Sequence, residues 1–291
     1  MDESRWLAVL LSQNFLIVCG GYTAFMTLLW WLRRPLRNGG MVDLGWPCGL
    51  VTIGIYFFLV GNGWTPRRAV LCGMYAFCGL RFIVGWLERT IREGEDRRWN
   101  YWRRHWQEGN GPFGIRSIDF NFLIYYYAQS TTTLLLGAVP LALSAGESRE
   151  EFHPLELAAI GLWVLCITLE HVADHQLYRF RKNPANKLEV CRKGLWAYSR
   201  HPNYFFEFML WVAYALYAWP FAAGWVDRAF LLALPVGMYW TLSYYTGIPL
   251  TEKVSLERRG EPFRRYQQEV NRFFPWFPKV SDLKSGTSST K

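Results

Sequence analysis

Long apolar runs recur along this chain, and they constrain its fold more than any other feature. A run of about 20 apolar residues matches the hydrocarbon core of a bilayer, and only helices or closed barrels can span that core. The sequence therefore predicts an all-α multi-pass membrane protein with about seven transmembrane helices. The predicted spans cover residues 6–32, 42–61, 67–88, 120–143, 155–177, 201–221 and 226–248.

Lysine and arginine fall mainly in alternate connections between these runs. If the N-terminus faces out, 26 of the 32 Lys and Arg residues lie on the inner side, five lie outside or at outer ends of runs, and Arg81 lies deep inside a run. Cytoplasmic loops carry such an excess, which predicts an outer N-terminus and a cytoplasmic C-terminus. The same rule explains the net charge of +9, so nucleic acid is not expected as a partner. The first run is too long for a signal peptide, and its positive charges follow it.

No repeat and no shift of composition divides the chain, so we expect one integral membrane domain over residues 1–280. Residues 252–274 mix charged and apolar side chains in a pattern typical of an interfacial helix. The residues 281–291 are rich in Ser and Thr and are predicted to be disordered. The apolar face of the interfacial helix would come from Val254, Phe263, Tyr266 and Val270.

The most informative polar segment runs from Gly194 to Glu207 and reads Gly-Leu-Trp-Ala-Tyr-Ser-Arg-His-Pro-Asn-Tyr-Phe-Phe-Glu. Pro202 suits the first turn of a helix, which places Asn203 and Glu207 on one face at i,i+4. A carboxylate inside a membrane helix is costly and usually lines a cavity. The segment therefore predicts a polar, partly cationic pocket at the membrane surface, with a bound polar ligand, and hence an enzyme.

Three further polar residues lie in the early runs. Asp43 starts the second run, where it either caps a helix or reaches into a pocket. Arg81 lies deep in the third run, where it either snorkels or faces a polar cavity. Gln129 lies in the fourth run, close to three consecutive tyrosines.

The end of the fifth run carries Glu170, His171, Asp174 and His175, which form two i,i+4 pairs. Histidines at this spacing can bind zinc, but the zinc-protease pattern needs Glu directly after the first His, where Val172 stands. No metal site is predicted. Asp174 is expected at a polar helix end that faces a cofactor, the alternative being a solvated helix end.

Five motifs together resemble the steroid 5-alpha reductase superfamily, and most closely its uncharacterised multi-pass branch. The resemblance runs from about residue 40 to residue 278. It implies a helical membrane fold whose C-terminal half, residues 120–280, binds NADPH from the cytoplasmic side. The motifs are Asp43-x-x-Trp46, Gly94-Glu-Asp-x-Arg98, Asp174-x-Gln176, the segment from Gly194 to Glu207, and Gly247-Ile-Pro249 with Arg258 to Pro275.

Characterised members of this superfamily reduce a carbon–carbon double bond, often conjugated to a carbonyl group, in a steroid or other lipid. By resemblance, the cofactor candidates are Asp174, Arg179, Arg200, His201, Asn203, Tyr204 and Glu207. Enolate charge that develops on the substrate oxygen needs a proton donor or a cation. Depth and chemistry give Asp43, Tyr75, Arg81 and Gln129 as the catalytic candidates.

Two other functions remain open. Membrane methyltransferases of the isoprenylcysteine or phospholipid type, which use S-adenosylmethionine, share the Arg-His-Pro-x-Tyr pattern and parts of the tail. A non-catalytic lipid binder is the second alternative, but it has no need of Asp43, Arg81 and Glu207 inside the runs. The expected partners are a lipid or steroid-like substrate and membrane lipids. The expected location is the endoplasmic reticulum membrane in a eukaryote or the cytoplasmic membrane in a bacterium.

Overall fold

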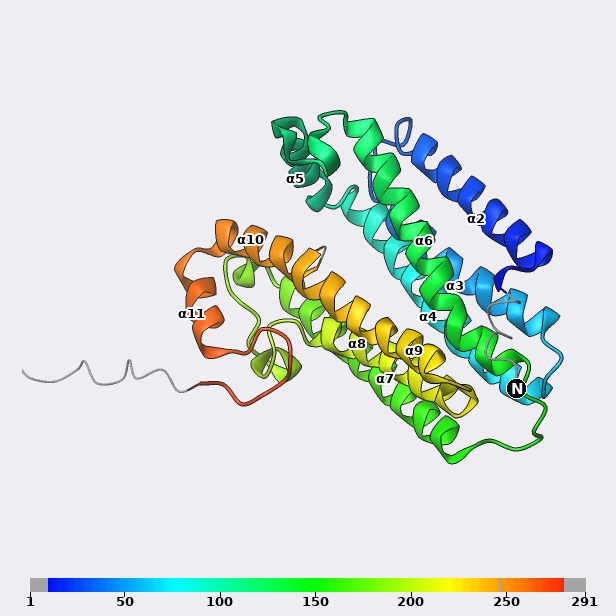
Figure 1. Ribbon diagram of the computed structural model, residues 1–291. Coiled ribbons are helices and arrows are strands. Elements are labelled where there is room, and N and C mark those ends of the chain that lie inside the picture. Colours follow the sequence, from blue (N-terminus) through cyan, green and yellow to red (C-terminus); the bar gives the residue numbers. More distant parts are fainter. Residues whose placement is uncertain (1–9, 246, 280–291) are drawn as a thin grey trace, which may run out of the picture. The chain divides into compact units, whose positions relative to one another are not determined.

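The computed structural model describes residues 10–245 and 247–279, and every regular element in these ranges is a helix (Figure 1). The prediction of an all-helical chain is therefore confirmed for the described residues. The first four residues of the predicted span 6–32 and the predicted disordered tail 281–291 lie outside them.

One helix lies at each of the seven predicted spans. By length and composition, four of them (α2, α3, α4 and α7) are able to cross a membrane, which makes this a membrane protein. The count of seven spans and the orientation of the termini stay predictions. The seven helices are α2 Gln13–Leu32, α3 Met41–Val60, α4 Thr65–Glu93, α6 Ile118–Ala145, α7 Pro154–Lys182, α8 Pro202–Ala218 and α9 Trp225–Trp240.

The chain divides into two compact units. The first unit comprises Met1–Ala159 and Tyr214–Leu234, and the second comprises Ile160–Ala213 and Pro235–Lys291. The boundaries fall inside α7, α8 and α9. The expectation of a single domain over residues 1–280 stays a prediction.

In the first unit, α3 packs against α2, α4 and α6 (Figure 1). Glycines allow two of these contacts. A Cβ on Gly79 of α4 would lie 2.7 Å from the carbonyl oxygen of Pro47 in α3, and a Cβ on Gly45 of α3 would lie 2.2 Å from the sulfur of Met26 in α2. Small residues let membrane helices approach closely in this way. The connection from α4 to α6 holds α5 Arg98–His105, η1 Trp106–Asn110 and η2 Pro112–Gly114.

In the second unit, the predicted single interfacial helix over residues 252–274 is wrong. The segment forms α10 Ile248–Arg259 and α11 Glu261–Glu269, which are separated at Gly260. Gly260 has a φ of 58°, a conformation that glycine adopts without steric cost. The remaining short elements are η3 Pro184–Asn186, η4 Gly194–Ala197, η5 Trp219–Phe221 and η6 Thr241–Tyr245.

Three of the four side chains expected to meet lipid instead form a small protein core. Phe263, Tyr266 and Val270 are buried together, and Val190 and Leu256 pack against them. The hydroxyl of Tyr266 donates to the carbonyl oxygen of Trp196 at 2.6 Å. This core fixes the C-terminal helices against the segment that contains the main polar motif.

Candidate functional site

The polar motif at the start of α8 is held by the C-terminal segment through main-chain contacts. The amide of Arg200 donates to the carbonyl oxygen of Asn271 at 2.9 Å. The hydroxyl of Ser199 donates to the carbonyl oxygen of Phe273 at 2.8 Å and accepts from the amide of His201 at 3.1 Å. The turn that leads into α8 is therefore fixed before any ligand binds.

Glu252 of α10 is the centre of a polar cluster around this turn. One carboxylate oxygen accepts from Arg200 Nε at 2.6 Å and lies 3.1 Å from His201 Nε2. The other accepts from Gln267 Nε2 at 2.8 Å. Burial alone would raise the pKa of Glu252, but the hydrogen bonds from His201 and Arg200 outweigh it and lower the pKa to about 2. The carboxylate is therefore charged at every physiological pH.

The Gly194-Leu-Trp part of the motif lies against the end of α7. The amide of Leu195 donates to Gln176 Oε1 at 3.0 Å, and Trp196 Nε1 donates to the carbonyl oxygen of Ala173 at 2.9 Å. Gly194 has a φ of 60°, and a Cβ there would lie 2.4 Å from Gln176 Nε2. The motifs Asp174-x-Gln176 and Gly194-Leu-Trp therefore contact each other.

Asp174 and Asn203 meet between α7 and α8. Asn203 Nδ2 donates to Asp174 Oδ1 at 3.0 Å. The imidazole of His201 stacks on the ring of Tyr204 at a centroid distance of 5.5 Å and 6° between planes. Glu207 is buried one turn further along α8 and accepts from Trp211 Nε1 at 3.1 Å. These contacts lie around the start of α8 and involve five of the predicted cofactor residues, namely Asp174, His201, Asn203, Tyr204 and Glu207.

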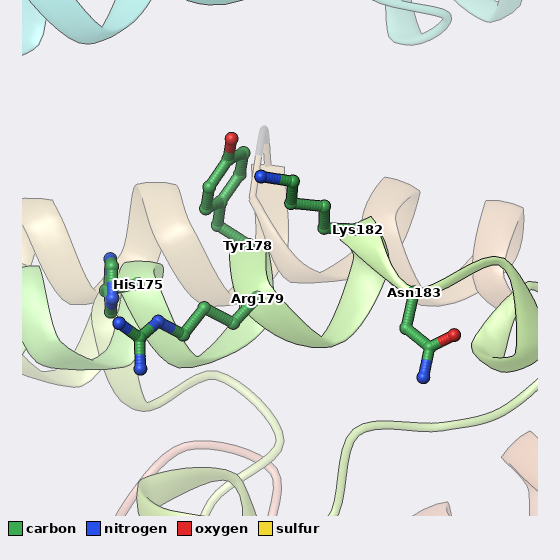
Figure 2. Close-up of a pocket in the computed structure, with 5 residues that line it drawn as sticks. All are labelled: His175, Tyr178, Arg179, Lys182 and Asn183. Carbon is green, nitrogen blue, oxygen red and sulfur yellow. The ribbon is translucent and has the colours of Figure 1, made fainter.

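Arg179 lies on α7 at an open depression of about 510 Å³ (Figure 2). His175, Tyr178, Lys182 and Asn183 also line this depression. All five side chains come from the last turns of α7 or from the residue that follows it. Arg179 and Lys182 are cations, and side chains of this kind can bind an anion such as a phosphate group.

The four catalytic candidates lie in the first unit, in separate surroundings. Tyr75 is fully buried, and its hydroxyl donates to the carbonyl oxygen of Gly137 at 2.8 Å. The guanidinium of Arg81 lies 4.5 Å from the ring centroid of Phe82. The main-chain oxygen of Gln129 accepts the hydroxyl of Thr133 at 2.8 Å. Asp43, the fourth candidate, belongs to a larger polar network.

Asp43 does not cap α3, because the N-cap is Gly40 and no side chain bonds to the helix end there. It instead accepts from Arg98 Nη2 at 3.4 Å, and Arg98 Nε also lies 3.1 Å from Asp96. Burial alone would raise the pKa of Asp96. The positive charges of Arg98 and Arg89 more than offset this effect, so the pKa of Asp96 lies below its ordinary value. The Asp43-x-x-Trp46 and Gly94-Glu-Asp-x-Arg98 motifs therefore contact each other.

Sequence reasoning missed several residues of the second unit. Glu252 entered as the first residue of the predicted interfacial helix, and no local signal linked it to Arg200 across 52 residues. Tyr178 and Lys182 follow the predicted Asp174 at i+4 and i+8, so an extension of the polar face by two turns would have found them. Asn183 follows the end of α7, and no helical pattern marks it.

Comparison with known proteins places the chain in a family. A family model described as "Protein of unknown function (DUF1295)" matches residues 29–270, and the chain belongs to this family. An uncharacterized protein of Schizosaccharomyces pombe is 24% identical over 279 residues, which cover 85% of this chain and 76% of that protein. No solved structure matches the chain.

A shorter stretch is similar to steroid dehydrogenases. Human 3-oxo-5-alpha-steroid 4-dehydrogenase 1 is 36% identical over 66 residues, which cover 23% of this chain and 26% of the human protein. The mouse protein of the same name is 33% identical over 67 residues, with the same coverage. The chain thus spans about a quarter of the length of these relatives. The resemblance to the steroid 5-alpha reductase superfamily and its uncharacterised branch is confirmed.

Proposed function

We propose that the protein is a multi-pass membrane oxidoreductase that uses NADPH to reduce a carbon–carbon double bond, conjugated to a carbonyl group, in a steroid or another lipid. The hydrogen bond between Asp174 and Asn203 carries the proposal, because it joins two motifs of the reductase resemblance. The similarity of one stretch to 3-oxo-5-alpha-steroid 4-dehydrogenases supports the same reaction class. The membrane would be that of the endoplasmic reticulum in a eukaryote or the cytoplasmic membrane in a bacterium.

The residues of the second unit fit NADPH in two respects. Arg179 and Lys182 are exposed at the open depression on α7, where they would hold the pyrophosphate or the 2′-phosphate. Asn203 Oδ1 is a buried acceptor without a hydrogen-bond partner in the described part of the chain. A buried acceptor of this kind needs a donor, and the carboxamide of a nicotinamide has one.

Arg200 and His201 have a different role in this proposal. Arg200 donates to Glu252 and to the carbonyl oxygens of Gln267 and Val270, the latter two at 2.8 Å each. A phosphate would have to displace these acceptors. We therefore assign Arg200 and His201 to positioning the first turn of α8, while Asn203, Tyr204 and Glu207 on that helix face the ligand.

Bound NADPH would supply the hydride, and the chain itself must supply a proton donor or cation at the substrate carbonyl oxygen. Asp43, Tyr75, Arg81 and Gln129 remain the candidates for this role. Asp43 and Arg98 are each about one-quarter exposed, so a polar substrate group can reach them. The hydroxyl of Tyr75 would first have to leave the carbonyl oxygen of Gly137.

The test measures which nucleotide stabilises the purified full-length protein in detergent. A ligand that binds the folded state raises Tm by mass action. We expect a clear rise with NADPH, a smaller rise with NADH because it lacks the 2′-phosphate, and none with S-adenosylmethionine. A rise with S-adenosylmethionine and none with NADPH would overturn the proposal in favour of the methyltransferase.

Substitutions at the depression test whether NADPH binds there. Arg179→Gln and Lys182→Gln should reduce the NADPH shift and leave the Tm of the free protein unchanged, since both side chains are exposed. Arg181→Gln and Lys187→Gln are the matched controls, because these exposed cations do not line the depression. Equal loss in the controls would mean that net charge, and not this site, attracts the nucleotide.

A further inference from the structure

The connection between α4 and α6 displays one aromatic side chain in a conformation that it rarely adopts. Phe113 is 90% exposed, and its backbone is left-handed, with φ 57° and ψ 22°. A bulky residue in this region is strained. Because the ring is exposed, it makes no packing contact in the core that would offset this strain.

The turn that carries Phe113 is tightly constructed. The amides of Gly114 and Ile115 donate to the carbonyl oxygens of Gly111 and Pro112. The carbonyl oxygen of Ile115 also accepts from Asn121 Nδ2 at 2.6 Å, and Asn121 is fully buried. The turn therefore holds Phe113 outward as a fixed projection.

The surroundings of this turn are basic. Seven arginines lie between residues 89 and 116, against four acidic residues. Arg98 and Arg103 pair with carboxylates. Five of the seven arginines are exposed, namely Arg89, Arg92, Arg97, Arg104 and Arg116.

The position of the connection relates it to a membrane surface. Helix α4 is long and apolar enough to cross a membrane and ends at Glu93, just before the connection begins. Ile91, in the last turn of α4, is 82% exposed. Figure 1 shows α5 at the end of the bundle of α2, α3, α4 and α6. Phe113 is the one large apolar side chain that is exposed between residues 94 and 117, which is too little for the apolar centre of a protein interface.

We propose that Phe113 and the exposed arginines anchor this connection to an anionic phospholipid surface. The ring inserts between head groups, and the arginines, chiefly Arg104 and Arg116, lie at the lipid phosphates. Interfacial binding combines apolar insertion with attraction to anionic lipids in this way. The strained turn keeps the ring directed outward, so that little freedom is lost on insertion.

Photo-crosslinking of the full chain in nanodiscs tests the anchor. Benzoylphenylalanine takes the place of Phe113 or, as a control, of the exposed Gln107 in the same connection. We expect lipid adducts at position 113, detected by intact-protein mass spectrometry, and few at position 107. Addition of phosphatidylglycerol to phosphatidylcholine should raise the yield at position 113 severalfold. Crosslinks from position 113 to protein, absence of lipid adducts, or equal yields in both lipids would overturn the proposal.

A thermal measurement separates anchoring from a structural role. Phe113→Gly relieves the backbone strain, so we expect its Tm in detergent to equal or exceed that of the wild type. The gain in Tm that phosphatidylglycerol nanodiscs give the wild type should shrink in Phe113→Gly and in the double variant Arg104→Gln, Arg116→Gln. A lower Tm of Phe113→Gly in detergent, with the lipid gain retained, would show that the ring only supports the fold.

Discussion

Arg200 and Glu252 are separated by 52 residues, yet Arg200 Nε donates to Glu252 Oε1 at 2.6 Å. Their side chains are only 9% and 13% exposed, so this ion pair is largely shielded from solvent. A partly buried pair of this kind contributes stability only when further hydrogen bonds satisfy both partners. Here Gln267 and His201 complete the coordination of the carboxylate.

The first prediction concerns pH. The pKa of Glu252 is about 2 in the folded protein, against an ordinary value of 4.5. A lowered folded pKa gives stability that is fully present above the ordinary value and is lost as the pH falls toward about 2. The full effect is on the order of 3 kcal/mol. We expect Tm to fall on acidification below about pH 4.5.

Glu252→Gln should have a lower Tm at neutral pH and a flatter acid profile, as measured by scanning fluorimetry in detergent. The control is Glu257→Gln, an exposed position on the same helix. The prediction would be contradicted if the Tm of the wild type did not change on acidification below about pH 4.5, or if both variants had the same dependence of Tm on pH.

The second prediction concerns the contact between Gly194 and Gln176. Gly194→Ala adds a Cβ that would lie 2.4 Å from Gln176 Nε2, on a residue with a φ of 60°. We expect the free energy of unfolding to fall by about 1–3 kcal/mol. Adding Gln176→Ala to this variant should restore only part of the lost free energy of unfolding, because the backbone strain at residue 194 persists.

Gly161 of α7 provides the matched control for this change. A Cβ there meets no atom within 4 Å, and alanine favours a helix over glycine by up to about 1 kcal/mol. Gly161→Ala should therefore be neutral or stabilising. Equal effects of Gly194→Ala and Gly161→Ala on Tm would show that the left-handed turn at Gly194 is not required.

The third prediction concerns an ion pair buried in the first unit. Arg67 Nε donates to Glu156 Oε1 at 2.7 Å, and both side chains are 0% exposed. Glu156→Ala leaves the guanidinium without its charge partner, which costs about 3–5 kcal/mol. We expect a large fall in Tm and in the yield of folded protein.

The control is Glu150→Ala at an exposed position, which should leave Tm and the yield of folded protein unchanged. Replacing both partners by methionine should cost less than Glu156→Ala, because no buried charge then remains unpaired. If Glu156→Ala behaves like the exposed control, the pair contributes nothing to stability.

The fourth prediction concerns Arg81 as a catalytic candidate. A charge in a membrane helix costs roughly 2.5–3.5 kcal/mol on insertion scales, so Arg81→Leu should leave the protein folded or more stable. If Arg81 acts on the substrate, the same change lowers the rate of NADPH oxidation with an enone-containing lipid at least about tenfold. Arg92→Leu, at the exposed end of α4, is the control. Full activity of Arg81→Leu would mean that the residue only snorkels.

The helices could be predicted because each apolar run is long enough to leave a clear signal without any knowledge of its neighbours. The C-terminal pair could not, because the amphipathic pattern of residues 252–274 continues across Gly260, where the backbone turns. The sequence around Phe263 and Tyr266 does not indicate whether lipid or protein surrounds these side chains. Their burial depends on Val190 and Leu256, which pack against them.

The candidate site could be predicted in part. Asp174 and Asn203 were expected in one site, and they share a hydrogen bond. The partner of Arg200 could not be found, because nothing in its local sequence distinguishes Glu252 among the 23 acidic residues. Whether the predicted site residues bind a cofactor stays a prediction.

The contacts of the turn before α8 also bear on how the chain is made. Ser199 and Arg200 depend on acceptors at Glu252, Asn271 and Phe273. At about 5–20 residues per second, a ribosome needs roughly 3–15 s to complete these partners. During this interval the side chain of Arg200 lacks the carboxylate that it pairs with in the folded protein. A chain that ends before residue 252 would keep an arginine without its carboxylate, so the turn before α8 needs the C-terminal segment to reach its native contacts.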